Sequence, residues 1–185
     1  MMNELIILLV AITFQAIVER YMGRLWISDQ GIRFIGTNSQ QIADWYTLSH
    51  IIHGFIFYAV FYNVFHNTLW AFGASVALES CWEMLENSPF IINKYRKTAS
   101  IDYNGDTILN SACDVLWMSL GFLIASLTPW YMPLAAAISM ELLTLFVIRD
   151  NLTLNVIMLI YPFQAIKNWQ QAGGASKAFV GDKHD

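Results

Sequence analysis

Histidine and carboxylate side chains recur at helical spacing in two segments of this sequence. The segment DWYTLSHIIHGF places His50 and His53 about one turn apart, so both imidazoles project from one face of a helix. The segment LESCWEMLENSPF carries Glu79, Glu83 and Glu86 at spacings of four and three, and these form one stripe as well. Imidazole and carboxylate groups on facing helices can bind a divalent metal ion or transfer protons in acid–base catalysis.

A third polar stripe opens the segment DYNGDTILNSACD. Asp106, Asn110 and Asp114 recur every four residues there, and Asp102 stands just before them. Carboxylate oxygens are the ligands that Mg²⁺ prefers, and Arg96 in the preceding loop could hold the phosphate that such an ion bridges. A structural interpretation also stays open, in which Glu79 and Glu83 form ion pairs with Arg96 or Lys94, while Glu86 and Asp102 are ordinary interfacial residues.

Three chemistries are compatible with this set of side chains. One is a divalent metal centre, a second is Mg²⁺ held against a phosphate, and a third uses His50 or His53 as a general base oriented by Glu79 or Glu83. The sequence contains no Glu-x-x-His pair, no phosphate-binding glycine loop and no GxSxG motif. The residue pattern therefore indicates a polar site without deciding its reaction.

The elements that must hold these groups are membrane helices. Of the 185 residues, 56% are hydrophobic and only 13% are charged, whereas soluble domains are near one quarter charged. The net charge of −4 argues against a nucleic-acid partner. Apolar segments close to the length of a membrane span predict an all-α integral membrane protein with five transmembrane helices, over residues 5–21, 46–65, 69–87, 106–127 and 132–149.

The C-terminal part contains a shorter apolar stretch, LTLNVIMLIYPF, at residues 152–163. It predicts a short helix that is re-entrant, interfacial or a sixth span. We expect residues 1–170 to form a single polytopic membrane domain and residues 171–185 to form a disordered polar tail. Cys81 and Cys113 fall in apolar segments, where packed thiols are expected.

The connections predict how the polar stripes meet. Short turns at residues 66–68 and 128–131 make the helices that they join antiparallel. With five spans, all ten Lys and Arg residues then fall on one face, which the positive-inside rule makes cytoplasmic. The three stripes reach one depth on this side, and intramembrane ionisable groups rarely face lipid. We predict that His50, Glu83 and Asp106 converge on one cavity.

The sequence also carries a family resemblance. The stretches ADWYTLSHIIHGFIFY, ESCWEMLENSPFIINKYRKTASIDYNGDTILNS and IRDNLTLNVIMLIYPFQAIKNWQ resemble the uncharacterised bacterial membrane protein family UPF0314, over roughly residues 20–170. This resemblance implies a fold and a residue set but no reaction. The order Glu79/Glu83, Arg96, Asp106 and Asn110 resembles, more distantly, the VanZ-like superfamily, which implies at most a role in the cell envelope.

The leading hypothesis from these observations is a small membrane enzyme, a hydrolase or transferase that acts on a lipid or lipid-linked envelope substrate. We expect it in the bacterial inner membrane, with its N-terminus outside and its C-terminus inside. A non-catalytic protein that binds or transports an ion, a proton or a lipid headgroup, and a subunit of a larger membrane complex, are the alternatives. The predicted catalytic residues are His50, His53, Glu79, Glu83, Asp102 and Asp106, the predicted substrate-binding residues are Arg96, Arg149, Asn110 and Asp114, and the ligands of a divalent metal ion, if one is bound, are His50, His53, Glu79, Glu83 and Asp106.

Overall fold

The computed structural model describes residues 2–172, and the regular structure within them is helical. An isolated bridge between Ile35 and Ala43 is the only strand-like pairing in this range. The prediction of an all-α protein is therefore confirmed. The eight helices of the described residues are α1 (Met2–Tyr21), α2 (Thr47–Phe65), α3 (Thr68–Glu86), α4 (Pro89–Tyr95), α5 (Ile108–Leu127), α6 (Tyr131–Ile148), α7 (Leu152–Ile160) and α8 (Gln164–Ala172).

Four of these helices are long and apolar enough to cross a membrane, namely α1, α2, α5 and α6. The fifth predicted span corresponds to α3, which has 19 residues but is not among the four. Its second half carries the three glutamates, and their charges lower the mean hydropathy of the whole helix. The structure thus shows a helical protein with four candidate membrane spans.

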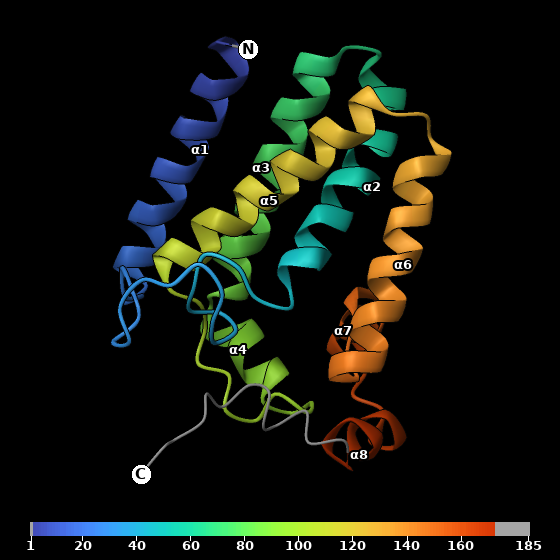
Figure 1. Ribbon diagram of the computed structural model, residues 1–185. Coiled ribbons are helices and arrows are strands. Elements are labelled where there is room, and N and C mark those ends of the chain that lie inside the picture. The colour runs from blue at the N-terminus through green and yellow to red at the C-terminus, as the bar shows by residue number, and fades with distance from the viewer. Residues whose placement is uncertain (1, 173–185) are drawn as a thin grey trace.

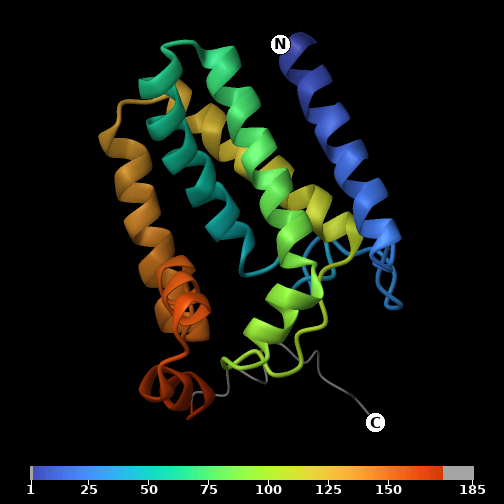
Figure 2. The ribbon, with the colours of Figure 1, turned by 180° about the vertical axis from the view of Figure 1, so that it is seen from behind.

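The long helices alternate in direction along the bundle (Figure 1, Figure 2). The N-terminus and the two short turns, α2–α3 and α5–α6, lie at one end. The connection between α1 and α2, together with α4 and α8, lies at the other end. The first turns of α2 and α5 and the last turn of α3 therefore meet at this second end, which is the arrangement that the three polar stripes require.

Two glycines allow α2 and α5 to pack backbone against backbone. A Cβ atom at Gly54 would lie 2.1 Å from the carbonyl oxygen of Met118, and one at Gly121 would lie 2.2 Å from the carbonyl oxygen of Ile51. No residue with a side chain fits at such distances. This close approach holds the first half of α2, with its two histidines, directly against α5.

Apolar and polar residues occupy different parts of the bundle interior. A buried cluster of Ala71, Phe72, Val115, Met118 and neighbouring apolar residues joins the first half of α3 to the middle of α5. Many of the buried polar residues, including His50, Glu79, Glu83, Asp106 and Asp114, lie instead near the end where α2 and α5 begin and α3 ends. The apolar cluster packs the helices against one another, and the buried polar side chains at the other end form the candidate site.

Helix α4 lies in a segment that the sequence predicts as a polar connection. Pro89 occupies its first turn, and the Ser88 side chain accepts a hydrogen bond from the backbone N–H of Ile91 at 3.4 Å. Proline and serine are favoured at these positions of a helix N-terminus. The helix extends over only seven residues, so it does not alter the number of spans.

The C-terminal apolar stretch forms α7, which has nine residues. At about 1.5 Å per residue it is about 14 Å long, less than half of the roughly 30 Å that a span must cross. The alternative of a sixth span is therefore wrong for this segment. The predicted tail of residues 171–185 begins inside α8, and the remainder of it lies outside the described residues.

Candidate functional site

A cavity of about 260 Å³ opens between α2, α3, α5 and α7. It has a polar part at the end of the bundle where the stripes meet and an apolar part beside α3 and α7. The apolar part is lined by Phe57, Leu78, Trp82, Leu152, Val156 and Leu159. The polar part holds six carboxyl groups and two imidazoles, those of Asp44, Glu79, Glu83, Glu86, Asp106, Asp114, His50 and His53.

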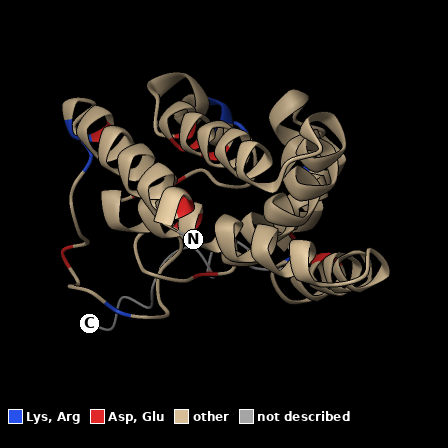
Figure 3. Cartoon of the chain, turned by 90° about the horizontal axis from the view of Figure 1, so that it is seen from above, with Lys and Arg blue, Asp and Glu red and all other residues tan. Residues whose placement is uncertain are grey.

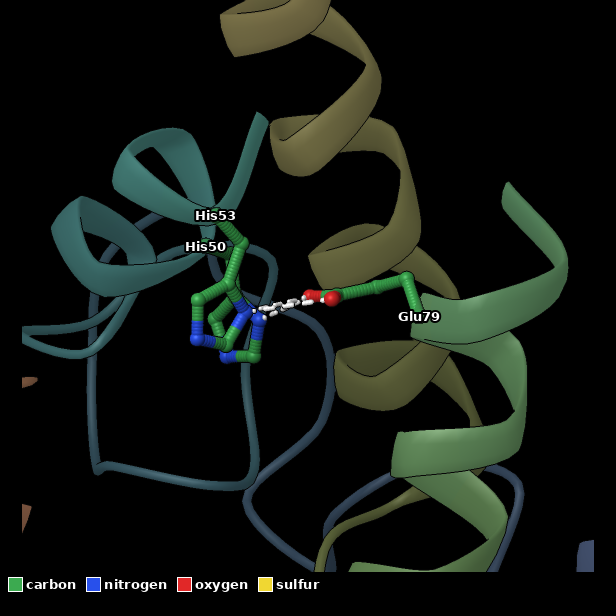
Figure 4. Close-up of side chains that lie close together, drawn as sticks. All are labelled: His50, His53 and Glu79. Carbon is green, nitrogen blue, oxygen red and sulfur yellow. Dashed lines mark hydrogen bonds and ion pairs between the residues drawn. The ribbon is translucent and has the colours of Figure 1, made fainter. Parts of the chain in front are cut away.

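The two histidines of α2 share one carboxylate of α3. Nδ1 of His50 lies 2.7 Å from Oε1 of Glu79, and Nδ1 of His53 lies 3.1 Å from both carboxylate oxygens of Glu79. Figure 4 shows both imidazole rings directed at this carboxylate across the gap between the helices. Glu79 is completely buried, so its carboxylate oxygens are contacted by these rings and not by water.

The second glutamate of the stripe faces both α2 and α5. Oε1 of Glu83 lies 3.6 Å from Nδ1 of His50, and Nε2 of His50 lies 3.7 Å from Oδ2 of Asp114. These separations are too long for hydrogen bonds. Oε1 of Glu83 and Oδ1 of Asp114 have no hydrogen-bond partner and are buried. The centre of the cluster thus contains acceptor oxygens that no protein donor reaches.

Ser111 of α5 links this cluster to Glu19, a buried residue of α1. The Ser111 hydroxyl lies 2.5 Å from Oε1 of Glu19 and 2.9 Å from Oε2 of Glu83, and it accepts a hydrogen bond from Gln15 at 2.7 Å. A hydroxyl carries one hydrogen and can donate it to one of the two carboxyl groups. The other carboxyl group must then donate, so one of the two glutamates holds a proton in this arrangement.

Two tyrosines beyond α3 lie beside Asp106 and Glu86, namely Tyr103 in the loop after α4 and Tyr95 at the end of α4. Tyr103 donates a hydrogen bond to Oδ2 of Asp106 at 2.9 Å. Burial raises the pKa of Asp106 from 3.8 to about 6, although the Tyr103 hydrogen bond lowers it. Burial also raises the pKa of Tyr95 well above its ordinary value, with the carboxyl group of Glu86 contributing to that rise. Both phenols therefore remain protonated donors at neutral pH.

Local hydrogen bonds fix the starts of two helices that line the cavity, α2 and α5. Oδ1 of Asp44 accepts from the backbone N–H groups of Tyr46 and Thr47, at 2.8 and 3.2 Å, at the beginning of α2. At the beginning of α5, Oδ1 of Asn87 accepts from the backbone N–H of Asp106 at 2.7 Å. These bonds join the end of α3 to the start of α5 and set the depth of the polar stripes.

Seven of the predicted site residues line the cavity. The predicted convergence of His50, Glu83 and Asp106 is confirmed, because all three belong to its lining. The roles that the sequence assigns to these residues in catalysis or metal binding stay predictions. The seven residues are His50, His53, Glu79, Glu83, Asp106, Asn110 and Asp114.

The other three predicted site residues do not line this cavity. Arg96 binds the loop that follows it, donating from Nε to the carbonyl oxygen of Tyr103 at 2.8 Å. Arg149 donates to the carbonyl oxygen of Trp169 at 3.0 Å and stacks on its ring. Asp102 is exposed and lines a separate, smaller cavity. The predicted arginine clamp is therefore absent from the site, because each arginine bonds to backbone near its own segment.

The cavity is consequently rich in acids and poor in cations. No Lys or Arg is found in its lining, as far as the described residues extend. Seen from above, the red segments of Asp and Glu occur on the helices of the bundle, and most blue segments of Lys and Arg lie in connections and at helix ends (Figure 3). Among residues 2–172, the two imidazoles are the only basic side chains that line the cavity with the six carboxyl groups.

Several residues of the site are missing from the sequence-based set. Glu19 stands beside Arg20 at the end of an apolar helix, so it resembles an interfacial ion pair, yet it is completely buried. Asp44 lies two residues before the N-cap of α2, and its carboxylate accepts hydrogen bonds from the backbone at the start of that helix. Tyr103 sits in a polar loop without periodicity. The sequence offers one signal for Glu19, which is that a charged residue within the last turn of a membrane helix usually faces the protein interior.

Comparison with known proteins identifies the family of the chain. The family described as "Protein of unknown function (DUF2585)" matches residues 11–172. A UPF0314 protein of Rhizobium meliloti is 47% identical over 169 residues, with 86% of each chain covered. A UPF0314 protein of Brucella anthropi is 53% identical over 136 residues, which are 72% of this chain and 69% of the relative. The chain belongs to this family.

The relatives bear on the earlier resemblance in two ways. Membership of the UPF0314 family is confirmed, and a third relative, from Sphingopyxis alaskensis, is 52% identical over 74% of each chain. The more distant resemblance to the VanZ-like superfamily stays a prediction, since none of these relatives bears on it. No solved structure matches the chain. The site must therefore be interpreted from its own chemistry.

Proposed function

We propose that this protein is an integral membrane hydrolase or transferase that acts on a lipid or lipid-linked envelope substrate at the cavity. One observation carries the proposal: a single cavity joins an apolar wall to a buried cluster of imidazole and carboxyl groups. Such a cavity suits a molecule with an apolar chain and a polar, reactive head. The cluster contains the acids and bases that ester or phosphoester chemistry needs.

The cavity borders the outer surface of the bundle through apolar side chains. Leu78 and Val156 line it and are 45% and 46% exposed. Its volume of about 260 Å³ lies below the usual range for a pocket that encloses a whole drug-sized ligand. We infer that only the polar head of the substrate enters, while its hydrocarbon chains stay in the lipid beside α3 and α7.

The chemistry begins with activation of a nucleophile by the His–Glu cluster. In hydrolysis the nucleophile is water, which bonds to the acyl or phosphoryl centre as the bond to the leaving oxygen breaks. The proton of the water passes to a base in the cluster, and the leaving oxygen takes up a proton. Either His50, oriented by Glu79, is that base, or a metal ion lowers the pKa of the water.

This function requires α3 to lie in the membrane as a fifth span. The support is its packing, because Glu79 and Glu83 face the interior with 0% and 1% exposure, while Trp70 and Leu85 face outward. The charged residues of α3 then do not meet lipid, which is the usual condition for acids in a span. The clustering of Lys and Arg at one end favours the inner membrane with the N-terminus outside.

The proposal is tested by incubating the purified full-length protein with polar lipids of a bacterium that carries a family member, in mixed micelles, and following the lipids by mass spectrometry. We expect one lipid class to be consumed and a matched product to form. Glu79→Gln should abolish this conversion, and His66→Asn, a change at the exposed far end of α2, should preserve it. Lipid profiles that are identical for the wild-type protein and Glu79→Gln would refute the proposal.

A further inference from the structure

We propose that the cavity binds one divalent transition-metal ion through His50, His53, Glu79 and Glu83. The four side chains come from two antiparallel helices, two from the first half of α2 and two from the second half of α3. The backbone packing of α2 on α5 and the hydrogen bonds at the end of α3 fix the positions of these helix segments. The donor atoms are therefore presented by rigid elements.

The donor atoms already lie close together, at separations slightly below or near the edges of a coordination polyhedron. Bonds of about 2.1 Å place tetrahedral ligand atoms about 3.4 Å apart. The Nδ1 atoms of His50 and His53 lie 2.7 and 3.1 Å from Glu79 Oε1, and Glu83 Oε1 lies 3.6 Å from Nδ1 of His50. Ligand atoms of His50, His53 and Glu79 all lie within 4.8 Å of one another. Glu83 falls in a second such group, with His50 and Asp114, so His50 is the residue that the two groups share and Glu83 reaches the ion from the side of His50.

An unpartnered oxygen points independently to a ligand at this position. Oε1 of Glu83 has no hydrogen-bond partner, although its side chain is only 1% exposed. A buried carboxylate oxygen without a donor is costly. The same is true of Oδ1 of Asp114 on the opposite side of His50. A cation between these groups would satisfy Glu83 directly and would reduce the charge that Asp114 meets.

The balance of charge at the cavity favours a cation over further protein donors. Six carboxyl groups face two imidazoles, and the described residues place no Lys or Arg in the lining. Closely spaced carboxylates in a site of low dielectric cannot all be ionised without positive charge nearby. An ion of charge two, bound at the histidines, supplies positive charge beside Glu79 and Glu83, and Glu83 also belongs to the group of carboxylates with Glu86 and Asp106.

The donor types indicate which metals fit. Imidazole nitrogen suits Zn²⁺, Mn²⁺ and Fe²⁺, whereas Mg²⁺ and Ca²⁺ prefer sites made of oxygen alone. The side chain of His53 is 17% exposed and borders the cavity, so positions on that side of the ion remain open to water or substrate. A metal site that keeps a coordination position open to water or substrate is typical of catalytic metal sites, whereas structural metal sites are closed by protein ligands. This inference does not rest on the proposed reaction.

The test uses the full-length protein, purified in detergent without chelators from cells grown with added Zn²⁺, Mn²⁺ and Fe²⁺. Elemental analysis should find about one equivalent of one of these metals per chain. His53→Ala and Glu79→Gln should each lower the affinity for that metal at least tenfold. His66→Asn changes a histidine at the opposite end of α2, outside the cavity, and this variant should retain the metal.

A second measurement keeps the inference testable if the variants do not fold. X-ray absorption at the edge of the bound metal, on the wild-type protein, should show two imidazole ligands. Metal content below one tenth of an equivalent, with no change in thermal stability on adding each metal, would overturn the inference, as would a metal bound without imidazole. Metal bound without lipid conversion would refute the proposed reaction alone, and conversion by metal-free protein would refute the metal alone.

Discussion

A single methyl group at Gly54 should separate the two helices that build the cavity. In Gly54→Ala the new Cβ would lie 2.1 Å from the carbonyl oxygen of Met118, 2.5 Å from the backbone nitrogen of Phe122 and 2.8 Å from the carbonyl carbon of Gly121. All three atoms belong to the backbone of α5, so no side-chain rotation relieves the clash. The helices must move apart by about 1.3 Å, from 2.1 Å to ordinary contact near 3.4 Å.

The size of the effect follows from what this separation disrupts. Overpacking a tight interface costs about 1–3 kcal/mol, and we expect the upper end because both partners are backbone. The same movement displaces the first half of α2, which carries the proposed ligands His50 and His53, away from α5, where Oδ2 of Asp114 lies 3.7 Å from Nε2 of His50. Gly54→Ala should therefore lower the free energy of unfolding by about 3 kcal/mol and weaken metal binding.

Gly73 of α3 provides a matched control on the same type of element. A Cβ there would meet only the Cδ1 atom of Ile7 at 3.8 Å, which is ordinary contact. Gly73→Ala should be neutral or stabilise the helix by up to about 1 kcal/mol. Unfolding both variants in micelles with increasing SDS, followed by circular dichroism, compares them directly. Equal stability of Gly54→Ala and Gly73→Ala would refute the backbone packing of α2 on α5.

Three further changes test the surroundings of the site. Burial raises the pKa of Asp150 from 3.8 to about 6, so between these two pH values the folded state holds a proton that the unfolded state has lost. The free energy of unfolding therefore falls by about 3 kcal/mol as the pH rises through this window. Asp150→Asn should remove this part of the decline in melts between pH 4 and pH 7, and an unchanged pH profile would contradict it. Glu141→Ala removes the acceptor of the backbone N–H groups of Leu152 and Thr153, at 2.9 and 3.0 Å, and should lower thermal stability by about 1–2 kcal/mol. Asp44→Ala should cost about 1–3 kcal/mol in the same assay, with Asp44→Asn closer to the wild-type protein because it keeps one acceptor oxygen at the start of α2.

The sequence predicts the helical part of the site well, for a physical reason. Residues spaced by three and four lie on one face of any helix, and charged groups in membrane helices turn inward. These two rules place His50, His53, Glu79 and Glu83 at one cavity without knowledge of the fold. The short connection between α2 and α3 adds that the two helices are antiparallel neighbours, so the histidines and glutamates meet at one depth.

The loops could not be predicted by the same reasoning. No periodicity constrains where Arg96 points, and its contacts with Tyr103 and Asn104 depend on how the loop folds back. Sequence also gives no sign that Ser111 joins α1 to the cavity, because a serine in a membrane helix usually bonds to its own backbone. Arg96, expected as a partner of the glutamates, bonds within its own loop instead, and the two histidines are the basic residues that remain beside them.

The three glutamates of α3 share a stripe but not an environment. Glu79 accepts from two imidazoles, and Glu86 lies beside the phenol of Tyr95, which remains a donor at neutral pH. Glu83, between them, meets Ser111 on one oxygen and no donor on the other. One helical stripe thus produces one paired carboxylate, one carboxyl group beside a phenol and one carboxyl group with an unpartnered oxygen. That unpartnered oxygen of Glu83 is buried 3.6 Å from Nδ1 of His50, whose Nε2 lies 3.7 Å from Asp114, so the middle glutamate faces the histidine that both proposed ligand helices and α5 surround.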